Sequence, residues 1–315
     1  MERRAFGKTD LEVSLIGLGC ARIGGVFQGD PRSVARLLAV AGDAGINFFD
    51  TADMYAQGES EAQLGRAFGS RRKQVIIATK AGYCLPGRRK LAGHLKPLLR
   101  PVIRALGLRR DQLPAAARGA MAQNFSADYL VRSLEASLRR LRTDYVDLFQ
   151  LHSPSLEVIE RGEWEPVLDG LKRSGKLRYF GIACDSIAAA RAALRFEGVS
   201  AVQFTFGLLQ PEALELLLPE AAERGVACIA RECLGNGLLV KQEAEMDLAS
   251  YCSSQAEVES RTVQLAQLRQ QATERGLPLS GIALDFAARA RGVSVALVGA
   301  RTPQQLRQLL DDFPN

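Results

Sequence analysis

The chain has 315 residues, of which 47% are hydrophobic and 24% are charged, and its net charge is +6. This composition is typical of a globular protein, and the lack of any uninterrupted run of about 18 apolar residues excludes a transmembrane helix. The first ten residues are polar and lack the apolar core of a signal peptide, so a cytoplasmic location is expected. The scattered cysteines and the two histidines have no zinc-ligand or disulfide spacing, so no metal site is expected.

In chain order, the first predicted element is a β-hairpin, with strands at 3–6 and 11–14 around the turn Gly7-Lys8-Thr9-Asp10. Short apolar runs rich in Val, Ile, Leu and Phe then predict eight strands, and such runs are typical of strands buried on both faces. These runs lie at 15–20, 46–50, 75–79, 146–151, 179–183, 201–206, 227–230 and 293–298.

Amphipathic stretches alternate with these strands, and several end at a glycine, which commonly terminates a helix. The predicted helices span 33–44, 59–68, 129–141, 164–172, 187–196, 213–223 and 302–310, and 257–291 contains two more separated at Gly276-Leu-Pro278. Eight βα units predict an α/β fold of the (β/α)8 TIM-barrel type, with residues 1–315 as a single domain. An open Rossmann sheet is disfavoured because residues 17–22 match GxGxxG only in part.

Polar residues follow three neighbouring strands at their carboxyl ends, where a barrel places its active site. Asp50 ends the second strand, Lys80 ends the third and His152 ends the fourth, while Tyr55 lies one turn after Asp50. We expect an Asp50–Lys80 ion pair to hold a cation beside Tyr55 and to lower the pKa of the phenol. Tyr55 would then exchange a proton with a carbonyl oxygen, which a neutral His152 would hold by a hydrogen bond.

Residues 84–125 form a long insertion after the third strand. Between 81 and 125 there are nine Lys and Arg against one acid, a charge of +8, so the other 270 residues sum to −2. Leucines at helical spacing predict a helix packed on the barrel rim with a solvated basic face. Two other interpretations stay open: a pocket wall that attracts an acidic or phosphorylated substrate, and a docking surface for an acidic protein partner or an anionic membrane. Nucleic-acid binding is not expected, because no aromatic residues lie between the basic ones.

Several segments together resemble the aldo-keto reductase family, and the similarity runs along the whole chain. The matching segments are 17–19, 47–55, 78–80, 144–154, 175–181 and 299–306. The resemblance implies that Asp50, Tyr55, Lys80 and His152 form the catalytic tetrad. It also implies direct hydride transfer between NADP(H), bound without a Rossmann fold, and a small-molecule carbonyl or alcohol substrate.

The cofactor positions follow from the resemblance, and some depart from the family pattern. Arg301 precedes a helix N-terminus, a favourable anion site, and is expected to bind the 2′-phosphate of NADP. Family members place Ser-Asn where this chain has Ala183-Cys184, and an aromatic ring that stacks on the nicotinamide where it has Arg231. The guanidinium of Arg231 either stacks in place of that ring or pairs with Glu232 or another acid. The expected cofactor contacts are Cys20, Ala21, Cys184, Gln203, Arg231, Leu234, Gly235, Gly237, Gly299, Arg301, Gln305 and Gln308.

Three functions are compatible with these residues. The first is an NADP(H)-dependent carbonyl reductase or alcohol dehydrogenase with Tyr55 as general acid/base. The second is an NADPH-binding regulatory subunit similar to potassium-channel β subunits, with the insertion at 84–125 as its contact surface. The third is a Schiff-base aldolase that uses Lys80, and it is disfavoured by the adjacent Asp50 and by the cofactor-like segment at Arg301.

Overall fold

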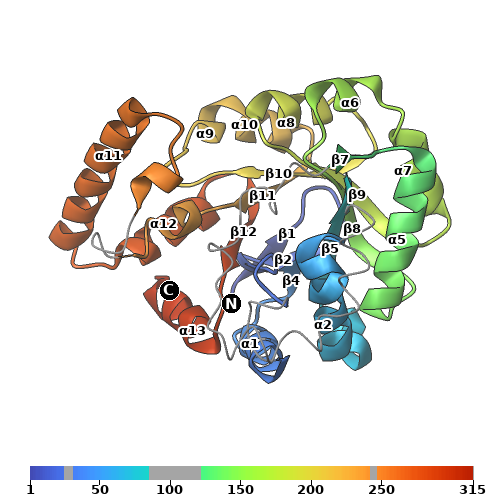
Figure 1. The fold of residues 1–315 in the computed structure, drawn as a ribbon, viewed down its shortest axis with the longest axis horizontal. Helices are drawn as coiled ribbons and strands as arrows, with labels where there is room; N and C mark the ends of the chain where they lie inside the picture. The colour runs from blue at the N-terminus through green and yellow to red at the C-terminus, as the bar shows by residue number, and fades with distance from the viewer. Residues whose placement is uncertain (25–30, 85–121, 242–246, 315) are drawn as a thin grey trace.

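The computed structural model describes residues 1–24, 31–84, 122–241 and 247–314. Within them eight parallel strands close into a barrel, in the order β3-β4-β5-β8-β9-β10-β11-β12, and β12 pairs with β3 to complete the circle (Figure 1). The strands are β3 Ile16–Gly19, β4 Phe48–Asp50, β5 Ile76–Ala81, β8 Val146–His152, β9 Leu177–Ala183, β10 Val199–Thr205, β11 Ala227–Arg231 and β12 Val293–Gly299. Their bounds lie within two residues of the predicted runs, and the predicted TIM barrel is confirmed.

Helices surround the barrel and bury their apolar faces against its outer surface (Figure 1). They are α1 Pro31–Asp43, α2 Glu59–Phe68, α5 Ala127–Leu141, α6 Leu156–Arg161, α7 Glu165–Arg173, α8 Ile187–Ala193, α9 Ala213–Leu216, α10 Leu218–Glu223, α11 Gln255–Glu274, α12 Leu279–Arg289 and α13 Pro303–Asp312. The predicted break between the last long pair is confirmed, because Gly276 adopts a φ of +62° and Pro278 precedes α12.

Two helical features differ from the prediction. The single helix expected over 213–223 is divided into α9 and α10 at Leu217, whose φ of −134° is not helical. Pro219 explains the division, since its ring has no N–H and clashes with the carbonyl four residues earlier in a continuous helix. The short helix α6 was not predicted. Its N-cap is Ser155, whose hydroxyl accepts a hydrogen bond from the Val158 N–H at 3.3 Å.

The predicted N-terminal hairpin consists of β1 Arg3–Ala5 and β2 Glu12–Ser14, paired antiparallel. It supplies Phe6, Leu11 and Val13 to a buried cluster with inward-facing barrel residues. The rings of Phe6 and Phe48 lie 5.7 Å apart within that cluster. The hairpin therefore closes the amino-terminal end of the barrel and leaves the carboxyl ends of the strands for the functional site.

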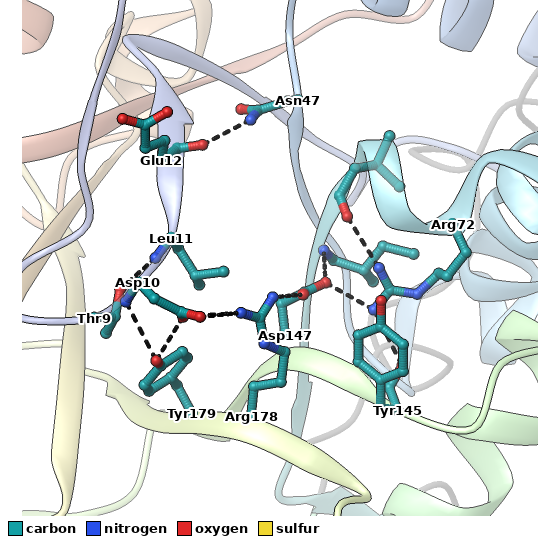
Figure 2. A network of polar contacts seen from close by, with 12 residues as sticks. Thr9, Asp10, Leu11, Glu12, Asn47, Arg72, Tyr145, Asp147, Arg178 and Tyr179 are labelled. Carbon is teal, nitrogen blue, oxygen red and sulfur yellow. Dashed lines mark hydrogen bonds and ion pairs between the residues drawn. The ribbon is translucent and has the colours of Figure 1, made fainter.

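A polar network fastens this hairpin to the barrel (Figure 2). Asp10, in the hairpin turn, accepts hydrogen bonds from the Tyr179 hydroxyl at 2.6 Å and from Arg178 Nη2 at 2.8 Å. Arg178 Nη1 also donates to Asp147 Oδ1 at 3.0 Å, and Asp147 Oδ2 pairs with Arg72 Nη2 at 2.7 Å. The charges in this chain of contacts neutralise one another, so the network serves the stability of the barrel.

A cavity of about 720 Å³ lies on the same end of the barrel. It is lined by Asp10, Asp147 and Arg178 of the network and by residues at the starts of strands, such as Asn47 and Ile76. Because TIM-barrel active sites lie at the carboxyl ends of the strands, this cavity is at the opposite end from the candidate site.

The predicted insertion begins and ends in a short antiparallel pair, β6 Tyr83–Cys84 with β7 Ala122–Gln123. Its two ends therefore leave the barrel side by side. The helix expected on the rim, the possible pocket wall and the contact surface of the regulatory alternative fall mostly on 85–121, which lies outside the described residues. Among the helices that the structure describes, none has the length and apolar character needed to span a membrane.

Candidate active site

Asp50 and Lys80 form a buried ion pair at the carboxyl ends of β4 and β5. Lys80 Nζ lies 2.6 Å from Asp50 Oδ2 and also donates to the carbonyl oxygen of Thr51 at 3.0 Å. Burial alone would lower the pKa of Lys80, but the carboxylate of Asp50 and the phenol of Tyr55 outweigh it and raise that pKa. The Lys80 side chain is 1% exposed and its ammonium stays charged, so the predicted pairing with Asp50 holds that ammonium in a fixed place inside the barrel.

Two glutamine side chains hold the other oxygen of Asp50. Gln203 Nε2 donates to Asp50 Oδ1 at 2.9 Å, and Gln150 Nε2 lies 3.4 Å from the same atom. Sequence reasoning assigned Gln203 to the cofactor and did not identify Gln150. Both residues are buried, at 2% and 0% exposure, and the Asp50 carboxylate is thereby fixed by donors from three different strands.

Tyr55 lies in the short 3-10 turn Tyr55–Gly58, five residues after the end of β4 at Asp50. The turn bends sharply because Ala56 and Gln57 adopt left-handed φ angles of 50° and 61°. Lys80 Nζ lies 5.2 Å from the centre of the Tyr55 ring. Tyr55 therefore lies beside the Lys80–Asp50 pair, as predicted.

The expected lowering of the Tyr55 pKa was wrong. Burial of the phenol is the largest influence and raises its pKa above the ordinary value of 10, while the nearby Lys80 charge lowers it only in part. Burial disfavours the phenolate because that anion loses its hydration. Tyr55 is consequently protonated at neutral pH and available as a proton donor.

His152 ends β8, and its ring contacts the ring of Tyr55, which follows β4. Its ring lies 5.7 Å from the Tyr55 ring in an edge-to-face arrangement, and Tyr83 packs on it in the same manner at 4.9 Å. Burial and the charges of Lys80 and Arg231 lower the pKa of His152 well below 6.5, so the imidazole is neutral. Its buried Nδ1 has no hydrogen-bond partner among the described residues. Tyr83 was missed by the sequence analysis; the available signal was its place three residues after Lys80.

Arg231 ends β11 and forms an ion pair at the mouth of the barrel. Its Nη2 lies 2.6 Å from Asp185 Oδ1 and donates to the carbonyl oxygen of Cys184 at 3.2 Å. The expected pairing with an acid is therefore present with Asp185, and the other acid considered, Glu232, accepts a hydrogen bond from Asn236. The Nε of Arg231 is buried and has no hydrogen-bond partner in the described part of the chain.

The two predicted cysteines turn their side chains into the core. Cys20 and Cys184 are both 0% exposed, and burial raises the pKa of each thiol above its ordinary value. Their backbone N–H groups donate to Asp50 and Gln203 carbonyl oxygens at 2.7 Å. Ala21, which follows Cys20, is exposed at the rim.

The loop after β11 contains the predicted Leu234, Gly235 and Gly237. A 3-10 turn spans Gly235–Gly237, and its two glycines adopt φ angles of +56° and +101°. Residues with a side chain rarely adopt such φ angles. A Cβ added at Gly237 would meet only the end of the Lys241 side chain, so the space beside this glycine is open. The turn therefore leaves backbone accessible at the barrel mouth.

Arg301 is exposed just before the N-terminus of α13, as predicted. Its backbone N–H donates to Gln305 Oε1 at 2.9 Å, and Gln308 donates to Asp312 at 2.7 Å, so both predicted glutamines contact their own helix region. Gly299 precedes this segment, with no atom near the place of an added Cβ.

Arg22, which the sequence analysis did not single out, lies near Arg301. The pKa of Arg22 is lowered first by burial and then by the charge of Arg301. The two residues follow β3 and β12, which are neighbouring strands paired through Gly19 and Gly299. Two guanidinium groups beside a helix N-terminus form a site suited to a phosphate group.

Comparison with known proteins identifies the family of this chain. The model of the aldo/keto reductase family matches residues 15–314. The pyridoxal 4-dehydrogenase of Microbacterium luteolum is 28% identical over 98% of this chain and 91% of its own length. The D-threo-aldose 1-dehydrogenase of a Pseudomonas species is also 28% identical, over 96% of this chain and 90% of its own length.

Among solved structures, the holo form of the aldo-keto reductase AKR11C1 from Bacillus halodurans superposes with a TM-score of 0.76 and 26% identity, covering 100% of this chain and 92% of its own. The glycerol dehydrogenase AKR11B4 from Gluconobacter oxydans has a TM-score of 0.78 at 24% identity, covering 99% and 90% of the two chains. At this identity, the similarity to the glycerol dehydrogenase shows a shared fold only.

Proposed function

The chain belongs to the aldo/keto reductase family, a family of oxidoreductases, and on this premise we propose that it transfers a hydride between NADP(H) and a carbonyl or alcohol substrate. The observation that carries the proposal is the convergence of Tyr55, His152 and the Lys80–Asp50 pair at the carboxyl ends of three neighbouring strands. A bound reduced nicotinamide supplies the hydride. The protein supplies the proton and holds the substrate oxygen.

The neighbours of Tyr55 support its role as the general acid/base. In the reducing direction the protonated phenol donates its proton to the carbonyl oxygen as negative charge develops there. Lys80 stabilises the resulting phenolate by its charge, and Asp50 keeps Lys80 in place over 2.6 Å. In the oxidising direction the same phenolate accepts the proton of an alcohol. Because Lys80 is held by Asp50 and the Thr51 carbonyl, its charge is in position before the reaction begins.

His152 acts on the same oxygen. As a neutral imidazole it keeps one N–H, which donates a hydrogen bond to the substrate carbonyl and orients it toward Tyr55. The edge-to-face contacts of the imidazole with the Tyr55 and Tyr83 rings support one orientation of the His152 ring. A charged imidazolium would be costly at this position, because burial and two nearby cations all disfavour it.

The residues at the rim fit a nicotinamide cofactor. Arg301, at the N-terminus of α13, is the proposed ligand of the 2′-phosphate, with Arg22 beside it. The accessible backbone of Gly237, in the turn Gly235–Gly237, suits the pyrophosphate. Arg231 is the proposed planar group against the nicotinamide, and its unpartnered Nε supports a ligand at this place.

The substrate is a small carbonyl compound or alcohol. Two relatives of this chain are named for pyridoxal and D-threo-aldoses, which are polar molecules that carry an aldehyde or the cyclic hemiacetal formed from it. We therefore place pyridoxal and aldoses beside simple aldehydes, ketones and acidic carbonyl compounds as test substrates.

The experiment is a spectrophotometric screen at 340 nm. It follows consumption of NADPH and of NADH with the carbonyl compounds, and formation of the reduced cofactor from NADP⁺ and from NAD⁺ with the matching alcohols. We expect turnover with at least one carbonyl compound and a lower KM for the phosphorylated cofactor. Absence of both cofactor binding and turnover across the panel would contradict the proposal.

A further inference from the structure

Asp185 joins two loops that approach the candidate site from different strands. It follows β9, and its Oδ1 accepts hydrogen bonds from Arg231 Nη2 at 2.6 Å and from the Ser153 hydroxyl at 2.8 Å. Arg231 ends β11, on the side proposed to hold the nicotinamide, and Ser153 directly follows His152 on the proton-donating side. A single carboxylate oxygen therefore connects the two halves of the site.

The contact with Arg231 is more constrained than an ordinary surface ion pair. The Arg231 side chain is only 23% exposed, whereas that of Asp185 is 62% exposed. Nη2 is held at two points, because it also donates to the Cys184 carbonyl oxygen at 3.2 Å. Two acceptors on one nitrogen fix the rotation of the guanidinium and hence the direction in which its flat face and its remaining N–H groups point.

The fixed guanidinium leaves an unused donor. Its Nε is buried without a hydrogen-bond partner among the described residues. A buried N–H without an acceptor is costly, and such a group in a site is often completed by a ligand. The charge of Arg231 also acts on the pKa values of Tyr55, Lys80 and His152, which agrees with its closeness to the reacting groups.

The contact with Ser153 lies in a constrained turn. Ser153 has a left-handed φ of +52°, its N–H donates to the Ala183 carbonyl at 2.9 Å, and its own carbonyl accepts from Gln123 at 2.8 Å. The same Gln123 nitrogen lies 3.3 Å from the His152 carbonyl oxygen. With the hydroxyl bound to Asp185, the residue after His152 is held through backbone and side chain together.

From these contacts the geometry points to Asp185 as a positioning residue, which sets the plane of Arg231 against the cofactor and ties it to the turn that carries His152. This inference rests on the proposed function, since the cofactor is the group that Arg231 would contact. The contacts of the Asp185 carboxylate are with Arg231 and Ser153, and not with Tyr55 or His152. It acts through Arg231 on cofactor affinity and through Ser153 on the rate of the chemical step.

Three variants separate these two effects. Asp185→Ala removes both contacts, Asp185→Asn keeps an acceptor oxygen without the charge, and Ser153→Ala removes only the link to the His152 turn. The matched control is Asp128→Ala, because Asp128 forms a comparably short pair with Arg132 at 2.7 Å on the exposed face of α5. For each protein we would measure the Kd of NADPH by fluorescence, the KM of NADPH, kcat at saturating NADPH, and the circular dichroism spectrum.

We expect Asp185→Ala to raise the Kd of NADPH about tenfold and to lower kcat, with an unchanged spectrum. Asp185→Asn should restore most of the affinity, and Ser153→Ala should lower kcat while leaving the Kd near that of the wild type. The Kd measurements are repeated in a Tyr55→Phe background, where binding is read without turnover.

The inference would be overturned if the wild type binds NADPH and turns over, and Asp185→Ala has the same Kd, KM and kcat as the Asp128→Ala control. A wild type that binds no NADPH would instead remove the proposed function, and the inference with it. The two failures are therefore distinguishable.

Discussion

Arg140 Nε donates to Glu61 Oε2 over 2.6 Å, and this pair supports the turn that carries Tyr55. Glu61 is fully buried on α2 and also accepts from the hydroxyl of Thr79, the residue before Lys80, at 2.6 Å. The Arg140 side chain packs so closely on Gly58 that an added Cβ there would lie 2.5 Å from its Cδ. A single ion pair thus connects the segments on which Tyr55 and Lys80 lie.

The first prediction concerns this pair. Arg140→Met keeps most of the packing volume but leaves the Glu61 carboxylate buried without its cation, so we expect the free energy of unfolding to fall by about 3 kcal/mol. The kcat should fall as well, because the Tyr55 turn loses its support. Urea denaturation and steady-state kinetics would measure both changes. Arg132→Met is the control, because Arg132 is 69% exposed and should change stability by less than about 1 kcal/mol. Equal stabilities of the two variants would refute the prediction.

The second prediction tests the proton donor. Tyr55→Phe removes the phenolic O–H and keeps the ring against His152, so we expect kcat to fall by at least about 100-fold while the Kd of NADPH changes little. Tyr145→Phe is the control, because the Tyr145 ring lies 4.2 Å from the guanidinium carbon of Arg72, near the opposite end of the barrel. Retained turnover in Tyr55→Phe would remove Tyr55 from the acid/base role.

The positions of Asp50, Tyr55, Lys80 and His152 could be predicted because strand ends in a barrel converge whatever the details of packing. The local pattern of apolar runs was enough to locate those ends. The pKa of Tyr55 could not be predicted in the same manner, since its direction depends on whether burial or the Lys80 charge is stronger. That balance follows from side-chain packing, which periodicity does not describe.

Contacts between distant positions were also beyond the sequence. The cofactor contact of Gln203 stays a prediction, and the hydrogen bond from its amide to Asp50, which lies 153 residues earlier in the chain, was not foreseen. The expected ion pair of Arg231 with an acid is present, but the acid is Asp185 and not the adjacent Glu232, because β9 and β11 both pair with β10 and the segments at their carboxyl ends come together. A single sequence contains no signal for such pairings when the residues are ordinary polar types.

The third prediction concerns the pH dependence of stability. Burial, followed by the nearby Glu61 carboxylate, raises the pKa of Asp53 from 3.8 to about 7. A carboxyl group with a raised folded-state pKa favours folding when protonated, so its contribution is complete below pH of about 4 and is lost as the pH rises through about 7. We expect Asp53→Asn to be more stable than the wild type at pH 8, by at most about 4 kcal/mol, and to gain much less at pH 5.

Urea denaturation of both proteins at pH 5 and pH 8 would measure this difference. Asp128→Asn is the control, because the Asp128 side chain is 71% exposed and should alter stability equally at both values. The same stability difference for Asp53→Asn at the two pH values would show that Asp53 titrates normally.

The fourth prediction concerns the choice between NADPH and NADH. Arg301→Ala removes the proposed ligand of the 2′-phosphate, so we expect the Kd of NADPH to rise between about 10-fold and 100-fold and the Kd of NADH to stay unchanged. Arg22→Ala should produce a smaller change in the same direction, since Arg22 lies beside Arg301. Arg307→Ala, exposed on α13, is the control. An equal rise in the Kd of NADPH and of NADH would mean that Arg301 binds a part of the cofactor other than the 2′-phosphate.

The fifth prediction concerns the opposite end of the barrel. Asp147 is 2% exposed and pairs with Arg72 and Arg178, and it also accepts a hydrogen bond from the Ile77 N–H at 2.9 Å (Figure 2). Asp147→Ala leaves Arg72, which is also buried, without its carboxylate, so we expect a loss of about 3 to 5 kcal/mol in the free energy of unfolding.

Because Asp147 lies near the start of β8 and His152 at its end, kcat and the Kd of NADPH should stay close to the wild-type values at a temperature where the variant is folded. Asp10→Ala is the comparison variant: its side chain is 68% exposed and it contacts Arg178 from the hairpin, so its loss should be below about 1 kcal/mol. If Asp147→Ala changed the Kd of NADPH without lowering the free energy of unfolding, the two ends of the barrel would be coupled. Stability would then not be separated from the functional site at the carboxyl ends of the strands.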